Sequence, residues 1–225
     1  MAEATRAEAR RPRLLPWIEI VVIAAIFVGD RFHLIPVSKT PFLFALGWIS
    51  LRVRGLSWRD VGLARPHDWT MTLGWGLLCG FAMESLELFV TQPLLARLLG
   101  SQPDFSAFQR LHGSLKFLLV GILFAWTFAA FGEEMVWRGY LMSRVADIGR
   151  RRTTWIASLI AVNLLFALAH ASQGTVGVLD EALMGTILGL IYLASRRNLF
   201  IPIVAHGVAD TLDAFLFFAG LYPGT

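Results

Sequence analysis

Two adjacent carboxylates lie beside one of the most apolar stretches of the chain, in residues 131–140 (FGEEMVWRGY). A charged side chain at bilayer depth costs on the order of 2.5–3.5 kcal/mol even on lenient insertion scales. Glu134 and Arg138 are four residues apart, so on a helix they share a face, and a structural salt bridge would lower that cost. Glu133 points about 100° away and has no counter-ion close to it in the sequence. Glu133 is therefore the better candidate for a carboxylate that takes a proton from water.

Two histidines follow in helical patterns of their own. Phe166 and His170 are four residues apart, and so are His206 and Asp210. A single histidine in a membrane helix commonly makes hydrogen bonds only within the bundle. The presence of a second histidine with a residue four positions away favours one site to which both histidines contribute. Asp210 can fix the tautomer of His206, or the two side chains can bind one metal ion or one oxyanion.

Helix lengths indicate whether these groups can meet. Glu133 lies 18 residues before Arg151, and His170 lies 19 residues after it. At 1.5 Å per residue each is roughly 27 Å from this basic turn, so an antiparallel hairpin brings both to the same level. His206 lies nine residues past Arg197, about 13 Å along a helix, which leaves the depth of the site open.

The composition is that of a membrane protein. Of 225 residues, 56% are hydrophobic and 16% are charged, against about 25% charged residues in soluble domains. The mean hydropathy is +0.62. These values predict an all-α, polytopic membrane helix bundle. The net charge of +4 does not argue for nucleic acid, and the single cysteine, Cys79, excludes an internal disulfide and a Cys-based metal site.

Seven apolar runs predict about seven transmembrane helices, at residues 15–32, 40–53, 70–97, 116–137, 153–170, 176–195 and 199–219. The second run is short, and the third, interrupted by Glu84, Glu87 and Pro93, predicts a kinked or broken helix. With the N-terminus in the cytosol, 14 of the 20 Lys and Arg residues fall on inside segments and five on outside segments, with Arg138 inside a helix. This asymmetry predicts an N-in, C-out orientation.

Further acidic residues accompany the runs. Glu84 and Glu87 are three apart and could line the same cavity as Glu133. Asp180 and Glu181, near the sixth run, are expected at the membrane interface.

Three motifs occur in order on three predicted helices: Glu133-Glu134-x-x-x-Arg138, Phe166-x-x-x-His170 and His206-x-x-x-Asp210. Together they resemble the CPBP family of intramembrane proteases, which comprises CAAX proteases and bacteriocin-processing (Abi) enzymes. The resemblance covers about residues 115–220 and includes the continuations at 137–141 (WRGYL) and 169–174 (AHASQG). Many members have asparagine where this chain has Asp210, so a carboxylate changes the electrostatics of the site here.

The resemblance implies a role for each matching residue. The candidate catalytic residues are Glu133, Glu134, Arg138, His170, His206 and Asp210. Glu133 would activate water, Glu134 and Arg138 would support it, and the other three would bind a metal ion or stabilise an oxyanion. Two histidines with one or two carboxylates suit zinc, the possible ligands being His170, His206, Asp210 and Glu133. A metal-free site, with Glu133 as the base and His170 helping to hold the water, suits the same groups.

The apolar runs and the basic N-terminus, together with the resemblance, predict a single membrane domain with a basic cytosolic N-terminus (1–14), N-terminal transmembrane helices (15–114) and a CPBP-like catalytic core (115–220). Two Lys against 18 Arg favour a GC-rich genome and hence a bacterial cell membrane.

The leading functional hypothesis is an intramembrane endopeptidase, metal- or glutamate-dependent, that cleaves a membrane-anchored or lipidated substrate within the lipid bilayer. The alternative is a non-catalytic membrane protein that acts in bacteriocin immunity or as a binding scaffold. A proton-coupled transporter would place polar groups in both halves of the bundle, whereas here they concentrate in the last four runs, with Glu84 and Glu87 as the exception.

Overall fold

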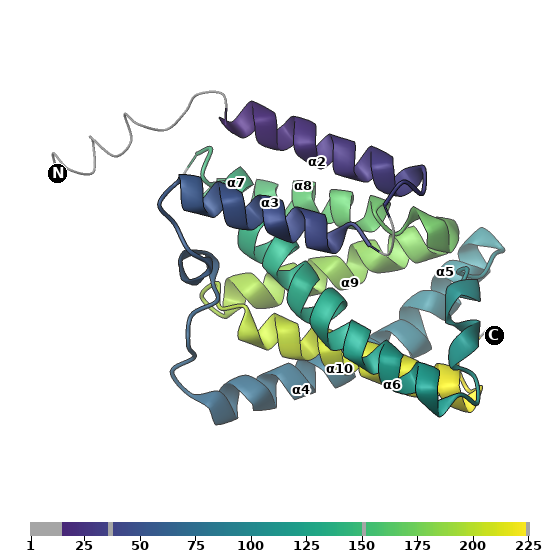
Figure 1. The fold of residues 1–225 in the computed structure, drawn as a ribbon. Helices are drawn as coiled ribbons and strands as arrows, with labels where there is room; N and C mark the ends of the chain where they lie inside the picture. Colours follow the sequence, from purple (N-terminus) through teal and green to yellow (C-terminus); the bar gives the residue numbers. More distant parts are fainter. Residues whose placement is uncertain (1–14, 36–37, 150–151, 224–225) are drawn as a thin grey trace, which may run out of the picture.

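The chain folds into a bundle of helices, and the all-α prediction is confirmed for the residues that the structure describes (Figure 1). This computed structural model describes residues 15–35, 38–149 and 152–223, none of which forms a β-strand. The predicted cytosolic segment 1–14 and the turn residues Arg150 and Arg151 lie outside the described residues. The α-helices are α2 (Leu15–Arg31), α3 (Thr40–Val53), α4 (Trp69–Leu86), α5 (Gln92–Leu99), α6 (Leu115–Phe124), α7 (Met142–Ala146), α8 (Arg152–Leu168), α9 (Gly174–Ala194) and α10 (Phe200–Ala219). The 3₁₀ segments are η1 (Trp58–Val61), η3 (Ser106–Leu111) and η6 (Ala171–Gln173), and the π-helical segments are η2 (Glu87–Thr91), η4 (Ala125–Glu133) and η5 (Met135–Leu141).

Two long helices continue through π-helical turns. α4, η2 and α5 form one helix, Trp69–Leu99, so the predicted interruption of the third apolar run is a π-helical turn rather than a break. α6, η4, η5 and α7 form the second, Leu115–Ala146. Its two π-helical segments meet at Glu134, in the middle of the Glu-Glu motif. π-Helical turns inside α-helices occur often at functional sites.

Within the described residues, four helices are long and apolar enough to cross a membrane: Trp69–Leu99, Leu115–Ala146, Ala171–Ala194 and Phe200–Ala219. The other three predicted spans form α2, α3 and α8, of 17, 14 and 17 residues. Helices of this length reach about 21–26 Å, less than the roughly 30 Å of a hydrocarbon core. Seven crossings and the N-in, C-out orientation therefore stay predictions.

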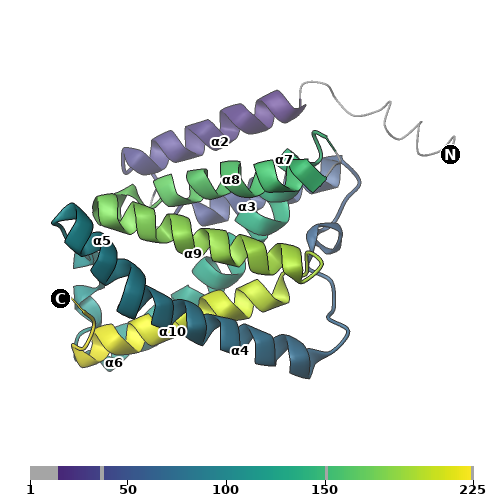
Figure 2. The same ribbon diagram turned by 180° about the vertical axis from the view of Figure 1, so that it is seen from behind.

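The helices stack in layers, and the order of the layers is the same in both views (Figures 1 and 2). α2 lies on the outside of α3 and α8, α9 lies in the middle, and α4 and α10 form the opposite side. α4 packs most extensively on α10, α8 on α9, and η4 on α10. Trp137, Tyr140 and Phe166 are at the centre of the core, where the second long helix crosses the bundle.

Two glycines let α4 and α10 approach closely. A Cβ on Gly80 would lie 2.6 Å from the carbonyl oxygen of Ala205 and 2.7 Å from the Cβ of Val208. A Cβ on Gly76 would lie 2.5 Å from the Cβ of Val204. Small residues at such a crossing bring two helices together in a membrane, where the hydrophobic effect between them is absent.

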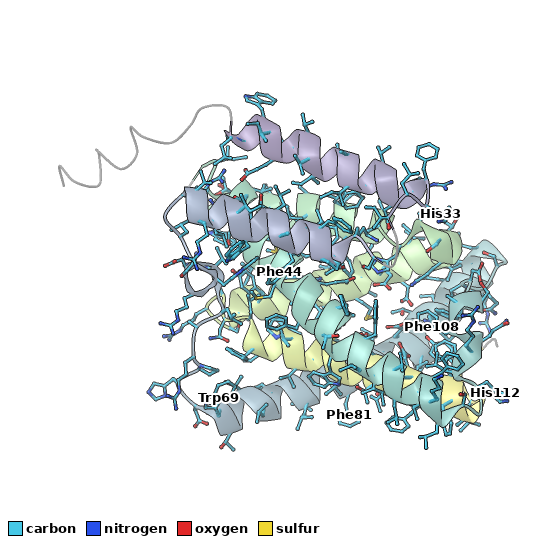
Figure 3. All side chains as sticks on the ribbon, viewed as in Figure 1. His33, Phe44, Trp69, Phe81, Phe108 and His112 are labelled. Atoms are coloured by element: carbon cyan, nitrogen blue, oxygen red, sulfur yellow. The ribbon has the colours of Figure 1, made fainter. Side chains whose placement is uncertain are left out.

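The outer side of α4 carries large exposed apolar side chains, as expected of a surface that faces lipid. Trp69, Trp75 and Phe81 are all exposed. Figure 3 shows Trp69 and Phe81 at the edge of the bundle. An apolar surface of this extent is rare on proteins that face only water.

The close α4–α10 crossing gives a testable expectation. Gly80→Ala should lower the free energy of unfolding by about 1–3 kcal/mol, because the added methyl group meets backbone at the crossing. Thermal unfolding in detergent measures the change. Gly74→Ala is the matched control, since a Cβ there meets no atom within 4 Å. Equal midpoints for the two variants would contradict the crossing.

Candidate active site

Glu134 and Arg138 form an ion pair inside the bundle, as their spacing predicts. Arg138 Nη1 donates to Glu134 Oε1 at 2.6 Å, and the two residues are 2% and 0% exposed. Arg138 Nη2 donates to the carbonyl oxygen of Gly185 at 2.8 Å, and Cζ lies 4.8 Å from the ring centre of Phe166. These contacts compensate the burial of the guanidinium and link η5 to α8 and α9.

His206 extends this ion pair to α10. Its Nδ1 lies 3.0 Å from Glu134 Oε1, and its Nε2 lies 3.5 Å from Asp210 Oδ1. A carboxylate only accepts hydrogen bonds, so the shorter contact assigns a proton to Nδ1 and fixes the ring. The sequence pattern left open whether Asp210 fixes the tautomer of His206 or shares a ligand with it; the carboxylate closer to the ring is that of Glu134.

Glu133 points away from the buried pair. Its Oε1 lies 3.5 Å from Thr40 Oγ1, near the limit of a hydrogen bond. Among the described residues, no lysine or arginine forms an ion pair with Glu133. Its carboxylate is partly exposed and lines a cavity, as a group that is to meet water requires.

His170 lies just past the end of α8. Its Nδ1 is 3.0 Å from the carbonyl oxygen of Phe166, which places the proton on Nδ1. Its Nε2 is 3.8 Å from Glu181 Oε1. The ring is thus held by its own helix end, with Nε2 as the nitrogen free to meet a ligand.

One cavity of about 540 Å³ joins these groups. The candidate residues that line it are Glu133, His170, His206 and Asp210. Glu134 and Arg138 do not line it and lie buried behind His206. The six candidates therefore divide into four that can touch a ligand and two that position His206.

Other residues near the site were not found from the sequence. Lys39, before α3, donates from Nζ to the carbonyl oxygen of Ala169 at 3.2 Å and pairs with Asp30 at 3.1 Å. Together with Thr40 it brings the start of α3 against the site. No motif marks these two residues, because only the fold brings α3 to Glu133.

Two acidic residues of α9 also belong to the lining of the cavity. Asp180 and Glu181 were expected at the membrane interface; both line the cavity, and Asp180 is 3% exposed. The beginning of α9 therefore faces the site, and the position of these two residues relative to the membrane stays a prediction.

A zinc ion does not fit the side chains as they stand. The described part of the chain contains no group of three or more His, Cys, Asp or Glu side chains that could hold a metal ion. Nδ1 of His170 is engaged by a carbonyl oxygen and Nδ1 of His206 by Glu134, so each ring has one nitrogen left.

The part of the chain that carries the site matches the model of a known protein family. A family model described as type II CAAX prenyl endopeptidase Rce1-like matches residues 115–212. The resemblance indicated by the three motifs is thereby confirmed over this stretch, which contains all six candidate residues. No curated protein and no solved structure matches the chain. The family match supports an intramembrane protease, and with the apolar helices it indicates a membrane protein.

The buried ion pair leads to a stability prediction. Arg138→Met should lower the free energy of unfolding by about 3–5 kcal/mol, since it removes the main counter-ion of a fully buried carboxylate. The double variant Glu134→Leu with Arg138→Met should cost less than the sum of the two single changes. Denaturant unfolding in detergent measures these values.

Arg97→Met serves as the control, because Arg97 is exposed at the end of α5 and its replacement should change stability by less than about 0.5 kcal/mol. Strictly additive losses in the double variant would contradict the ion pair.

Proposed function

We propose that this chain, whose residues 115–212 match the Rce1-like family model, is an intramembrane endopeptidase for membrane-anchored or lipidated substrates. The observation that carries the proposal is one cavity lined by Glu133, His170 and His206, which come from three separate helical regions. A volume of about 540 Å³ is within the usual range for a small-molecule or peptide site.

Glu133 is the general base in this proposal. Its carboxylate takes a proton from water while the water oxygen bonds to the carbonyl carbon of the scissile peptide. The tetrahedral intermediate then collapses, the C–N bond breaks, and Glu133 returns the proton to the leaving amine. The absence of an ion-pair partner among the described residues supports this role, because a counter-ion would weaken the base.

His206 stabilises the oxyanion that forms on the carbonyl oxygen, acting as an imidazolium that donates from Nε2 while its Nδ1–H donates to Glu134. Arg138 holds Glu134 in position. A donor that is fixed before the reaction stabilises developing charge without reorganisation. His170 has Nε2 on the same cavity and helps to hold the attacking water.

One observation favours a glutamate-dependent mechanism over a metal-dependent one in this proposal. Among the described residues, the His, Asp and Glu side chains of the cavity do not converge as a set of three or more metal ligands. If zinc were nevertheless required, incubation with a chelator would abolish cleavage, whereas the glutamate mechanism predicts that cleavage persists.

Replacement of the base tests the proposal. Glu133→Gln should reduce cleavage of membrane-anchored peptides by about 10²–10⁴-fold, the usual contribution of general-base catalysis. The measurement is product formation by mass spectrometry with purified protein in detergent. Asp147→Asn is the matched control, because this carboxylate pairs with Arg144 at the surface, outside the cavity, and should leave the rate unchanged.

Equal rates for wild type and Glu133→Gln would end the general-base role. A biological phenotype that persists in both Glu133→Ala and His170→Ala would instead favour the binding or immunity role.

A further inference from the structure

The start of α3 lies against both groups that contact the attacking water in the proposed mechanism. Lys39 directly precedes α3, and Thr40 is its first residue. Lys39 Nζ donates at 3.2 Å to the carbonyl oxygen of Ala169, the residue before His170. Thr40 Oγ1 lies 3.5 Å from Glu133 Oε1. Two consecutive residues therefore connect one short segment to the base and to the helix end that carries His170.

Lys39 completes the end of α8 from a different helix. The carbonyl groups of a last helical turn lack donors within the helix, and a cation near them is stabilised by the helix dipole. α8 ends at Leu168, and the N–H of Ala169 is still bonded to the last helical turn. The ammonium group of Lys39 donates to the next carbonyl oxygen of this end. The contact therefore fixes the backbone immediately before His170.

Asp30, in the last turn of α2, holds Lys39 in this position. Its Oδ2 lies 3.1 Å from Lys39 Nζ, and the two side chains are only 32% and 15% exposed. Asp30 also compensates the charge of Lys39. Lys39 thus lies one residue from the Glu133 contact without forming an ion pair with Glu133, and such an ion pair would weaken the base.

The hydroxyl group of Thr40 is oriented by Ser38. Ser38 Oγ donates to Thr40 Oγ1 at 3.2 Å, and it accepts from the backbone N–H of Thr40 at the same distance. A hydroxyl group has one proton, so that of Thr40 is left for Glu133. Thr40 is 4% exposed, which limits competition from bulk water. The separation of 3.5 Å is long for a hydrogen bond, as is common for catalytic contacts before a substrate binds.

A glycine permits this close approach. A Cβ on Gly132 would lie 2.9 Å from Thr40 Cγ2, so a larger residue directly before Glu133 would push the start of α3 away from η4. Lys39 and Thr40 themselves do not line the cavity. Any effect that they have on the reaction therefore passes through Glu133 and the end of α8.

We propose that Lys39 and Thr40 are positioning residues, which set the separation of Glu133 and His170 across the attacking water. The proposal rests on the proposed function and deepens it. Thr40 gives the carboxylate of Glu133 its direction, and Lys39, held by Asp30, fixes the end of α8. Such positioning matters for the rate because a displacement of about 1 Å can slow a reaction about 100-fold.

Two variants of Thr40 test the contact to the base, with the membrane-anchored peptides as substrates. Thr40→Val keeps the shape and removes the hydroxyl group, so it should lower kcat about tenfold, the usual worth of one hydrogen bond to a charged group, with KM within about twofold. Thr40→Ser keeps the hydroxyl group and should stay within about threefold of the wild type. Thr70→Val is the matched control, because Thr70 is exposed on α4. A loss with serine but not with valine would overturn the proposal.

The Glu133→Gln background separates positioning from a loss of folded protein. If Thr40 acts through Glu133, adding Thr40→Val should leave the residual rate of Glu133→Gln unchanged. Damage to the fold would lower the rate by the same factor in both backgrounds, and that result would overturn the positioning role of Thr40.

Lys39 is tested by removal and by conservative replacement. Lys39→Met should lower kcat about tenfold, because it removes a charged donor from the end of α8. Lys39→Arg can still donate to the carbonyl oxygen and to Asp30, so it should stay within about threefold of the wild type. Lys116→Met is the matched control, because Lys116, the other lysine of the chain, is exposed on α6. A wild-type kcat in Lys39→Met would overturn the proposal.

Amide hydrogen exchange tests the Lys39 contact without turnover. The N–H groups of Ala169, His170 and Gln173 are hydrogen-bonded at this helix end. Their exchange should become about tenfold faster in Lys39→Met and stay unchanged in Lys116→Met. Faster exchange in a protein that shows no Glu133-dependent cleavage would reject the protease and keep the structural contact. Glu133-dependent cleavage with unchanged exchange would reject the positioning role of Lys39 alone.

Discussion

The fold of the site depends on one buried chain of charges, Arg138–Glu134–His206, which joins the second long helix to α10. Each ion alone would be too costly at this depth, and their contacts compensate much of that cost. The same contacts fix His206, one of the two imidazoles that line the cavity. The contacts that let the charged residues of η5 lie inside the bundle therefore also engage Nδ1 of His206. They leave Nε2 as the nitrogen of this ring that can meet a substrate.

Much of this arrangement follows from spacing along the chain. The i, i+4 relation of Glu134 and Arg138 predicted their pairing, and the hairpin arithmetic predicted that Glu133 and His170 meet at one level. Both predictions use only helical periodicity and helix length. The π-helical segments η4 and η5 do not change either enough to separate these residues. The apolar runs likewise predicted an all-helical bundle, and four of them form helices of membrane-spanning length.

Other features required the tertiary structure. The contact between Glu134 and His206 joins residues 72 positions apart, and no local pattern encodes it. Lys39 and Thr40 reach the site because α3 folds back onto η4, and Asp180 is buried because α9 crosses the centre. Three apolar runs form helices shorter than the hydrocarbon core of a bilayer is thick. High hydropathy did not reveal this, because it is the same for a segment buried in protein and for one buried in lipid.

The glycine crossing of α4 and α10 has a consequence for how the cavity can change shape. Backbone in direct contact with a neighbouring helix leaves no room for sliding, so the part of the cavity lined by α10 should keep its shape. η3 and α6 also line the cavity, but a Cβ on Gly113 or Gly121, beside and within α6, would meet no atom closer than 3.5 Å. Accommodation of bulkier ligands should therefore arise by substitution and displacement of η3 and α6, while the part lined by α10 keeps its geometry.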